Sequence, residues 1–422
     1  MKDDVQNRFH DRSAQRTSPE DLLVASTLVQ ARWIFPVASE PIAHAAIEIA
    51  ADGRIAAIHR RAPRGAQDLG DVAIVPGFVN AHTHLEFSDL PAPLSPARPF
   101  SAWIRGLIAY RRRRGDGASA VRRGLEECRQ SGTIAFGEIV TQDWPVETPA
   151  DVPGAVLFRE LIGFLAETAD EQFEIARRFL QANSVGRAGA AVRGISPHAP
   201  YSVHPTLFER IVKLAAERQA PLAIHLAETQ AELQLLREGQ GELVDLLSDL
   251  GAWREGVVAR GARPLDYLRP LAALKRAVIA HGNYLDDEEI DFVAGHRNFA
   301  VAYCPRTHAF FGHAEHPWRK IIARGGLVAI GTDGRCSNPD LSIWNELLFL
   351  SARFAQSDPA MLLRMGTLNG ACALGVETEL GTLEKGKTAR AAIVRLGDVG
   401  ARDPYAALFH PGSRVERLLM DE

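Results

Sequence analysis

The sequence predicts an α/β protein in which a TIM-like (β/α)8 barrel is joined to a small β-sandwich domain formed from both ends of the chain. Strand-like and helix-like segments alternate along most of the chain, which is the pattern of parallel β/α construction. About eight strand-like segments take part, the number that closes a barrel. Short β-type runs without intervening helices occupy both ends. With 422 residues, of which 46% are hydrophobic, the chain is long enough for a barrel and an accessory domain.

Four segments follow one another along the chain. Residues 1–20 are charged and poor in β-branched and aromatic residues, so we predict a flexible tail. Residues 21–75 carry short strand-like runs with an Asp-Gly pair at 52–53, which predicts a tight hairpin and the first part of the β-sandwich. Residues 76–372 form the predicted barrel. Residues 373–422 contain two further strand-like runs, 381–396 and 413–421, which are predicted to complete the sandwich.

The predicted barrel begins with the strand VPGFVNAHTH, residues 75–84. An open doubly wound sheet is the alternative, but the sequence lacks its Gly-rich dinucleotide fingerprint. The basic run from Arg111 to Arg114 is interpreted as a solvated helix face or as the edge of a flap over a substrate. The other predicted strands are 132–140, 154–161, 190–197, 220–228, 277–285, 298–305 and 326–333, and the predicted helices include 118–131, 171–184, 204–219 and 285–295.

Charge and cysteine content exclude several classes of protein. With 48 Lys and Arg against 52 Asp and Glu, the net charge is -4, so no global positive field exists to bind nucleic acid or an anionic membrane. No apolar run is long enough to span a membrane, and the N-terminus lacks the apolar core of a signal peptide. The four cysteines are far apart without CxxC spacing, which argues against a disulfide framework and favours a cytoplasmic location.

The first predicted barrel strand ends in two histidines. His82 and His84 are separated by one residue, and side chains two apart on a strand point to the same side. Two imidazoles that converge at a strand end form a platform for zinc or ferrous iron. Because histidines also serve as hydrogen-bonded core residues, this pair alone is a weak signal.

Further polar residues stand at the ends of later strands. His225 and His281 each close an apolar run, and Asp333 follows another; a carboxylate there is costly to bury unless it is paired or binds a metal. Glu228, three residues after His225, is placed to exchange protons with a reacting water, although it also suits the start of a helix. His198 ends the preceding strand. Since barrel enzymes keep their sites at the carboxyl ends of the strands, the five positions together predict a metal-dependent active site.

These segments resemble the amidohydrolase superfamily over nearly the whole chain. The strings PGFVNAHTHLEF, HLAE, AHG and GTD occur in the order of the superfamily's first, fifth, sixth and eighth strands. The resemblance implies one divalent metal ion, zinc or iron, because the fourth strand has no lysine for a carbamylated bridging ligand. It further implies a catalytic group of Glu228, His281 and Asp333, and a ligand set of His82, His84, His225 and Asp333.

The resemblance also implies an activity. A glutamate three residues after the histidine, as at Glu228, is typical of the superfamily's deaminases rather than its triazine chlorohydrolases. The strings NAHTHLEFS, FSAWI and YCPRTHAFFGH are similar to those of the aminodeoxyfutalosine deaminases of menaquinone biosynthesis. We therefore expect hydrolysis of the exocyclic amino group of a purine-type nucleoside, with 6-amino-6-deoxyfutalosine as the first candidate. The alternatives are an S-adenosylhomocysteine, adenosine or guanine deaminase, a chlorohydrolase-type enzyme, or a metal-free scaffold.

Substrate contacts are predicted from residues near the strand ends. A purine-type ring or ribose calls for hydrogen-bond acceptors and stacking aromatic rings, and a substrate carboxylate calls for a guanidinium. The expected partners are one small heterocyclic substrate and water, with a homodimer as the family expectation. The residues predicted to contact the substrate are Glu86, Trp103, His198, Arg306 and Phe310.

Overall fold

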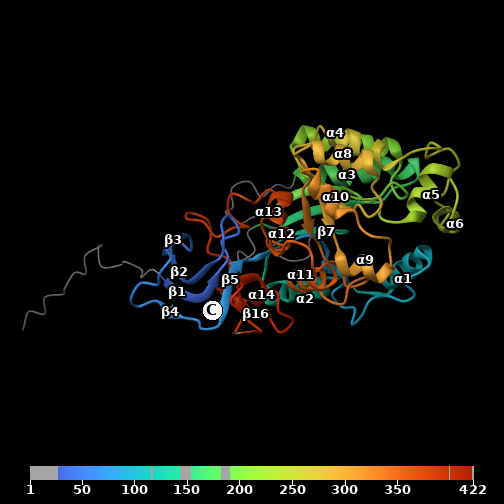
Figure 1. Ribbon diagram of the computed structural model, residues 1–422. Coiled ribbons are helices and arrows are strands. Elements are labelled where there is room, and N and C mark those ends of the chain that lie inside the picture. The colour runs from blue at the N-terminus through green and yellow to red at the C-terminus, as the bar shows by residue number, and fades with distance from the viewer. Residues whose placement is uncertain (1–26, 116, 143–153, 182–190, 399, 421–422) are drawn as a thin grey trace, which may run out of the picture.

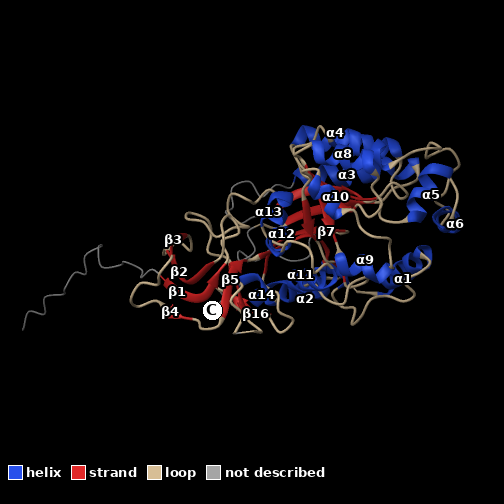
Figure 2. Cartoon of the chain, viewed as in Figure 1, coloured by secondary structure: helices blue, strands red, loops and turns tan. Residues whose placement is uncertain are grey.

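The computed structural model describes residues 27–115, 117–142, 154–181, 191–398 and 400–420, and its strands form two sheets. One sheet is a closed parallel barrel and the other is a mixed sheet built from both ends of the chain (Figures 1 and 2). The predicted fold class is confirmed. The predicted tail, residues 1–20, lies outside the described residues.

The barrel sheet closes because one chain segment pairs with both of its edges. β13 and β14 are two halves of that segment, separated by Gly331 and Thr332. The Gly331 N–H donates to the Tyr303 carbonyl at 2.8 Å, and the Thr332 N–H donates to the His82 carbonyl at 3.1 Å. All pairings between neighbours are parallel. The strands are β6 (Phe78–His84), β7 (Thr133–Val140), β8 (Val156–Leu161), β9 (Val192–Pro197), β10 (Leu222–Leu226), β11 (Ala277–His281), β12 (Phe299–Tyr303), β13 (Val328–Ile330) and β14 (Asp333–Gly334).

Burial on both faces explains why the barrel strands are almost continuously apolar. Every residue of β6, β7, β10, β11 and β12 is buried. The surrounding helices bury one stripe each; α4, for example, buries Leu207, Phe208 and Ile211. The helices are α1 (Phe100–Arg113), α2 (Ala118–Gln130), α3 (Ala166–Gln181), α4 (Pro205–Arg218), α5 (Gln230–Glu238), α6 (Glu242–Asp249), α7 (Pro264–Leu271), α8 (Asp287–Gly295), α9 (Pro305–Phe311), α10 (Trp318–Ala323), α11 (Ile343–Arg353), α12 (Pro359–Met365), α13 (Leu368–Leu374) and α14 (Pro404–Leu408).

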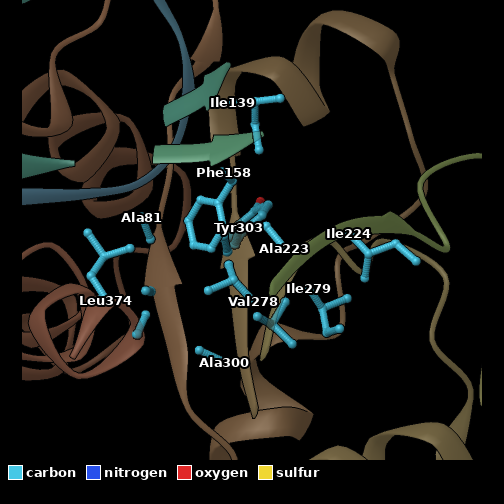
Figure 3. Close-up of a cluster of buried hydrophobic side chains, with 14 of the residues drawn as sticks. Ala81, Ile139, Phe158, Ala223, Ile224, Val278, Ile279, Ala300, Tyr303 and Leu374 are labelled. Carbon is cyan, nitrogen blue, oxygen red and sulfur yellow. The ribbon is translucent and has the colours of Figure 1, made fainter. Parts of the chain in front are cut away.

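Helix α13 covers the amino ends of the barrel strands. It contacts β6, β7, β11, β12 and β13, and Asn369 donates to the carbonyl of Val328 at the start of β13. A Cβ on Gly370 would lie 2.9 Å from the carbonyl oxygen of Val79, so only glycine allows this approach. Figure 3 shows Leu374 of α13 beside Ala81 of β6, within the buried cluster. With this end closed, access to the barrel interior is left to the carboxyl end.

The small sheet packs one face on the barrel and the other on its own core. Along β15, residues 391 and 393 belong to the small core, whereas residues 392 and 394 belong to the barrel core. β5 alternates in the same way at residues 72–75, as the two-residue period of a strand requires. The strands are β1 (Thr27–Ile34), β2 (Ile42–Ile49), β3 (Ile55–His59), β4 (Gln67–Asp68), β5 (Val72–Pro76), β15 (Ala391–Arg395) and β16 (Arg414–Leu418), in the order β16-β15-β5-β1-β2-β3 with β4 beside β1.

Two local predictions for the small sheet had different outcomes. The hairpin at Asp52-Gly53 is confirmed, with φ of 77° at Gly53 and β2 antiparallel to β3. The predicted strand 381–396 is correct only for residues 391–395, because Gly381 and Gly386 adopt left-handed conformations that turn the chain before it. No helix in the described ranges is both long and apolar enough to cross a membrane.

Candidate metal centre and active site

The two histidines of β6 point to one side of the strand, as predicted. His82 and His84 are buried, and their ring centroids lie 5.0 Å apart. The Nε2 atoms of His82 and His84 lie 3.6 and 3.5 Å from Oδ1 of Asp333. Asp333 comes from β14, which pairs with β6 where the barrel closes. Strands that are distant in the sequence therefore bring these three side chains together.

His225 and His281 complete a cluster of imidazoles at the carboxyl ends of the strands. The ring of His82 lies 4.9 Å from that of His225 and 5.4 Å from that of His281. The Nε2 atoms of His84 and His225 are 3.3 Å apart. Two groups of ligand atoms each lie within 4.8 Å of one another, one of His82, His225 and His281 and one of His82, His84 and Asp333.

The chemistry of these donors fits a divalent metal ion. Nε2 of His82 is buried and has no hydrogen-bond partner among the described residues. Nδ1 of His225 donates to the carbonyl of His198 at 3.0 Å, so the Nε2 lone pair of the neutral ring faces the cluster. Burial lowers the pKa of His84 and His225, which keeps both rings neutral. Burial acts to raise the pKa of Asp333, but the neighbouring imidazoles of His82, His84 and His281 together lower it, which favours the ionised carboxylate. Neutral imidazoles with one carboxylate form a donor set suited to zinc or iron.

Glu228 lies on the same side of the cluster as His281. Oε1 of Glu228 is 3.6 Å from Nε2 of His281, and both side chains are buried. Burial, and next the charges of Asp333 and Glu232, raise the pKa of Glu228 well above its ordinary value. Burial lowers the pKa of His281 to about 3. Burial thus favours the protonated form of Glu228 and the neutral form of His281, and a carboxyl group with a raised pKa is suited to donate a proton.

Three residues of the site have left-handed backbone conformations that non-glycine residues rarely adopt. Their φ angles are 53° at Ala227, 68° at His281 and 57° at Asp333. Such strain persists only where surrounding contacts hold it, and it concentrates at functional sites. All three residues follow or end a barrel strand, where the left-handed turn redirects the side chains toward the barrel axis.

Two buried side chains brace these turns, and the sequence analysis identified neither. The carboxylate of Glu232 accepts from the N–H of Ala227 at 2.9 Å and from the N–H of Glu228 at 2.8 Å. Nε2 of His316 donates to the carbonyl of His281 at 2.8 Å. Glu232 is the first glutamate after the HLAE string and lies four residues beyond Glu228, which is a signal that the sequence did carry.

The structure places Glu86 in an ionic cluster. The Glu86 carboxylate accepts from Arg111 at 2.6 Å, from Thr141 at 3.1 Å and also from Arg114. With both oxygens engaged by the protein, its predicted contact with a purine or ribose is unsupported. The prediction of a solvated or flap-edge basic run is wrong for Arg111 and Arg114. The side chain of Arg114 is 8% exposed, and Arg111 turns inward to two carboxylates. The reason is that both arginines form ion pairs with the buried carboxylate of Glu86.

The two aromatic residues predicted to contact the substrate lie in α1 and α9. Trp103 is buried, its indole N–H donates to the carbonyl of Cys336 at 3.1 Å, and its ring stacks on Phe100. Phe310 is half-buried beside Phe311 at a centroid distance of 5.0 Å. Their stacking on a substrate stays a prediction.

His198 contacts both the metal cluster and a further acid. Its ring centroid lies 4.8 Å from that of His225, and its Nδ1 is 2.6 Å from the hydroxyl of Ser202. Nε2 of His198 is 3.9 Å from Oε1 of Glu160 on β8. Burial lowers the pKa of His198 to about 3, so the ring is neutral. The predicted contact of His198 with the substrate stays a prediction.

Arg306 belongs to an internal network of ion pairs, and its contact with a substrate carboxylate stays a prediction. Its Nε donates to Glu346 at 2.8 Å, and its Nη1 and Nη2 donate to Asp340 at 2.8 and 2.6 Å. Glu346 is fully buried. All three guanidinium nitrogens are used by the protein, because α11 presents a buried carboxylate to the start of α9.

A model of the amidohydrolase family matches residues 73–415. The chain is 32% identical over 376 residues to a 5-methylthioadenosine/S-adenosylhomocysteine deaminase of Moorella thermoacetica, covering 84% of this chain and 82% of that protein. It is 30% identical over 356 residues to an aminodeoxyfutalosine deaminase of Deinococcus radiodurans, covering 81% and 82%.

Among solved structures, Helicobacter pylori aminofutalosine deaminase in complex with methylthio-coformycin superposes with a TM-score of 0.75, covering 93% of this chain and 98% of that chain. At 20% identity this likeness concerns the fold alone. The match to the family model includes every barrel strand and every residue of the polar cluster at their carboxyl ends. The chain belongs to the amidohydrolase family.

Proposed function

We propose that this amidohydrolase is a metal-dependent nucleoside deaminase, which removes the exocyclic amino group of a purine-type base with water. The observation that carries the proposal is the position of the buried Glu228, whose pKa is raised by burial, beside His281 and the cluster of imidazoles and Asp333. The two relatives that are 32% and 30% identical to this chain are named as deaminases of adenine-type nucleosides, which supports the same chemistry. The activity is a hydrolysis of a carbon–nitrogen bond.

The residues proposed to hold the metal are His82, His84, His225 and Asp333. When bound, a zinc or iron ion supplies a water that is nucleophilic at neutral pH. His281 is also within reach of the cluster, and we assign it instead to orienting the attacking water, because its Nε2 faces Glu228.

The proton steps follow from the two carboxyl groups. Asp333 accepts the proton released as water adds to the amino-bearing carbon. Glu228 gives its proton to the adjacent ring nitrogen, which lowers the cost of breaking the aromatic ring system as the new bond forms. Ammonia then leaves and a carbonyl oxygen remains on the ring.

Among substrates we put 6-amino-6-deoxyfutalosine first, because the strings NAHTHLEFS, FSAWI and YCPRTHAFFGH are similar to those of aminodeoxyfutalosine deaminases. 5′-Methylthioadenosine and S-adenosylhomocysteine are the second candidates, favoured by the relative at 32% identity. A guanine deaminase or a chlorohydrolase-type enzyme is the remaining alternative.

The proposal is tested by measuring ammonia release from a panel of these nucleosides, guanine and a chlorotriazine. The assay uses purified protein whose metal content has been measured. We expect turnover of at least one nucleoside, and a Glu228→Gln variant that is at least about 100-fold slower with unchanged metal content. Near-normal ammonia release by this variant would contradict the role of Glu228. Turnover confined to guanine or the chlorotriazine would contradict the substrate class.

A further inference from the structure

A cavity opens beside the metal centre at the carboxyl ends of β7 and β8. Its volume is about 260 Å³. His198 connects it to the metal centre, since this ring lies against His225 on one side and approaches Glu160 on the other. The lining residues are Arg111, Arg114, Thr141, Gln142, Arg159, Glu160, Ile162 and Gln172.

Glu160 presents an unsatisfied acceptor to this cavity. Its side chain is 3% exposed, and Oε1 has no hydrogen-bond donor within the described part of the chain. The nearest groups are Nε2 of His198, 3.9 Å from Oε1, and Nη2 of Arg111, 3.5 Å from Oε2. A buried carboxylate oxygen without a donor is costly, so its retention is explained best by a ligand that supplies one.

A donor with the same property lies next to this acceptor. Nε of Arg111 is buried and has no hydrogen-bond partner among the described residues. The cavity therefore combines a free carboxylate oxygen with a free guanidinium N–H, and a ligand group there must both donate and accept hydrogen bonds.

Charge narrows the kind of ligand. Arg111, Arg114 and Arg159 line the cavity and disfavour a cation. The carboxylate of Glu160, with that of Glu86 behind Arg111 and Arg114, disfavours an anion next to the unpaired oxygen. A neutral pair of hydroxyl groups meets both conditions, because each hydroxyl donates one hydrogen bond and accepts others.

We propose that this cavity binds the vicinal diol of the substrate ribose, with Glu160 as the acceptor that reads the hydroxyl groups. The inference rests on the proposed nucleoside deaminase activity. Glu86, the acceptor expected from the sequence, already accepts from Arg111, Arg114 and Thr141, so the diol contact is assigned instead to Glu160.

The test compares a ribonucleoside with its 2′-deoxy and 3′-deoxy analogues. The probe is whichever of 5′-methylthioadenosine, S-adenosylhomocysteine and aminodeoxyfutalosine the enzyme turns over fastest. For the wild type, kcat/KM should fall about 10- to 100-fold when a hydroxyl is removed, because Glu160 is then left unpaired. In Glu160→Gln the ratio of kcat/KM for the ribonucleoside to kcat/KM for its deoxy analogue should fall toward one. The kcat/KM values for the deoxy analogues themselves should change little.

Glu289→Gln is the matched control, since Glu289 is equally buried but accepts from the N–H groups of Leu265 and Asp286 outside the site. It should retain the wild-type ratio. If Glu160→Gln does not fold, Glu160→Asp keeps the charge facing Arg111 and should show the same loss of discrimination. A folded Glu160 variant that slows ribo and deoxy substrates equally, or a wild type that does not distinguish them, overturns the diol inference and leaves the deaminase intact. Absence of turnover of all three nucleosides overturns the proposed function itself.

Discussion

The guanidinium of Arg306 is divided between Asp340 and Glu346, two carboxylates of the protein itself. Burial raises the pKa of Glu346, and the charge of Arg306 acts against this shift. The side chain of Arg306 is 13% exposed, and all three of its guanidinium nitrogens donate to protein acceptors, so we expect it to contribute to the framework of the protein rather than to recognition. Removing one partner of a buried ion pair leaves an uncompensated charge, which is strongly destabilising.

We expect Arg306→Ala to lower the free energy of unfolding by about 3–5 kcal/mol, since Glu346 loses its counter-charge. The ratio of kcat/KM between substrates with and without a carboxylate should not change. Denaturant unfolding and kinetics on both substrates measure the two effects. Arg269→Ala, which removes an exposed ion pair with Asp266, is the control and should cost less than about 1 kcal/mol. Normal stability with a selective loss on the carboxylate-bearing substrate would restore the original prediction.

At the scale of the element, the turn from β10 to α5 positions the proposed acid. α5 begins after Thr229, whose hydroxyl accepts from the N–H of Glu232, and Glu232 in turn accepts from the N–H groups of Ala227 and Glu228. The side chain of Glu232, on α5, therefore fixes the backbone that carries Glu228. Burial raises the pKa of Glu232 to about 7, although the backbone hydrogen bonds act to lower it.

This shift predicts a pH-dependent stability. The pKa of Glu232 is about 7 in the folded state, against an ordinary value of 4.5 in the unfolded chain. The folded state therefore binds the proton more tightly, and unfolding releases a proton between about pH 4.5 and 7. The free energy of unfolding of the wild type should therefore fall relative to Glu232→Gln as pH rises through this window, and the difference should be constant above it. Unfolding midpoints of both proteins at a series of pH values measure the difference.

Glu217→Gln, a change at an exposed position of α4, is the control and should show no such slope against the wild type. A wild type whose free energy of unfolding rises with pH relative to that of Glu232→Gln, or does not change relative to it, would show that the pKa of Glu232 is not raised in the folded state.

At the scale of the whole molecule, the proposed metal ligands connect the first, fifth and eighth strands of the barrel. They lie on β6, β10 and β14, and the chain passes through α1 to α10 between the first and the last of these strands. α13 closes the opposite end, so the barrel is held together by apolar packing at one end and by polar groups at the other. A ligand that binds only the folded state stabilises it by mass action.

Removal of the metal should accordingly lower the melting temperature, and returning zinc or iron at about 100 times its dissociation constant should restore about 2.7 kcal/mol. Thermal unfolding before and after chelation, with metal content measured in parallel, provides the test. His84→Ala should lose both the metal and the response, whereas His59→Ala on β3 of the small sheet should retain both. A chelated wild type that melts at the untreated temperature would contradict the ligand assignment.

The sequence was sufficient for the features that depend on local pattern. The two-residue alternation of β6 placed His82 and His84 on one side, and apolar runs ending in His225, His281 and Asp333 marked the carboxyl ends of strands, which meet in any barrel. The small sheet from both chain ends followed from the same periodicity.

What only the tertiary structure decided is the partner of each charged side chain. Arg111 faces Glu86 and Glu160, and Arg306 faces Glu346, across separations of 25 to 49 residues. Strand periodicity is a property of neighbouring residues, whereas the partner of a charge depends on how distant elements pack around it. For this reason the ligand cluster could be predicted from the sequence, while the roles of Glu86, Arg306 and Glu160 could not.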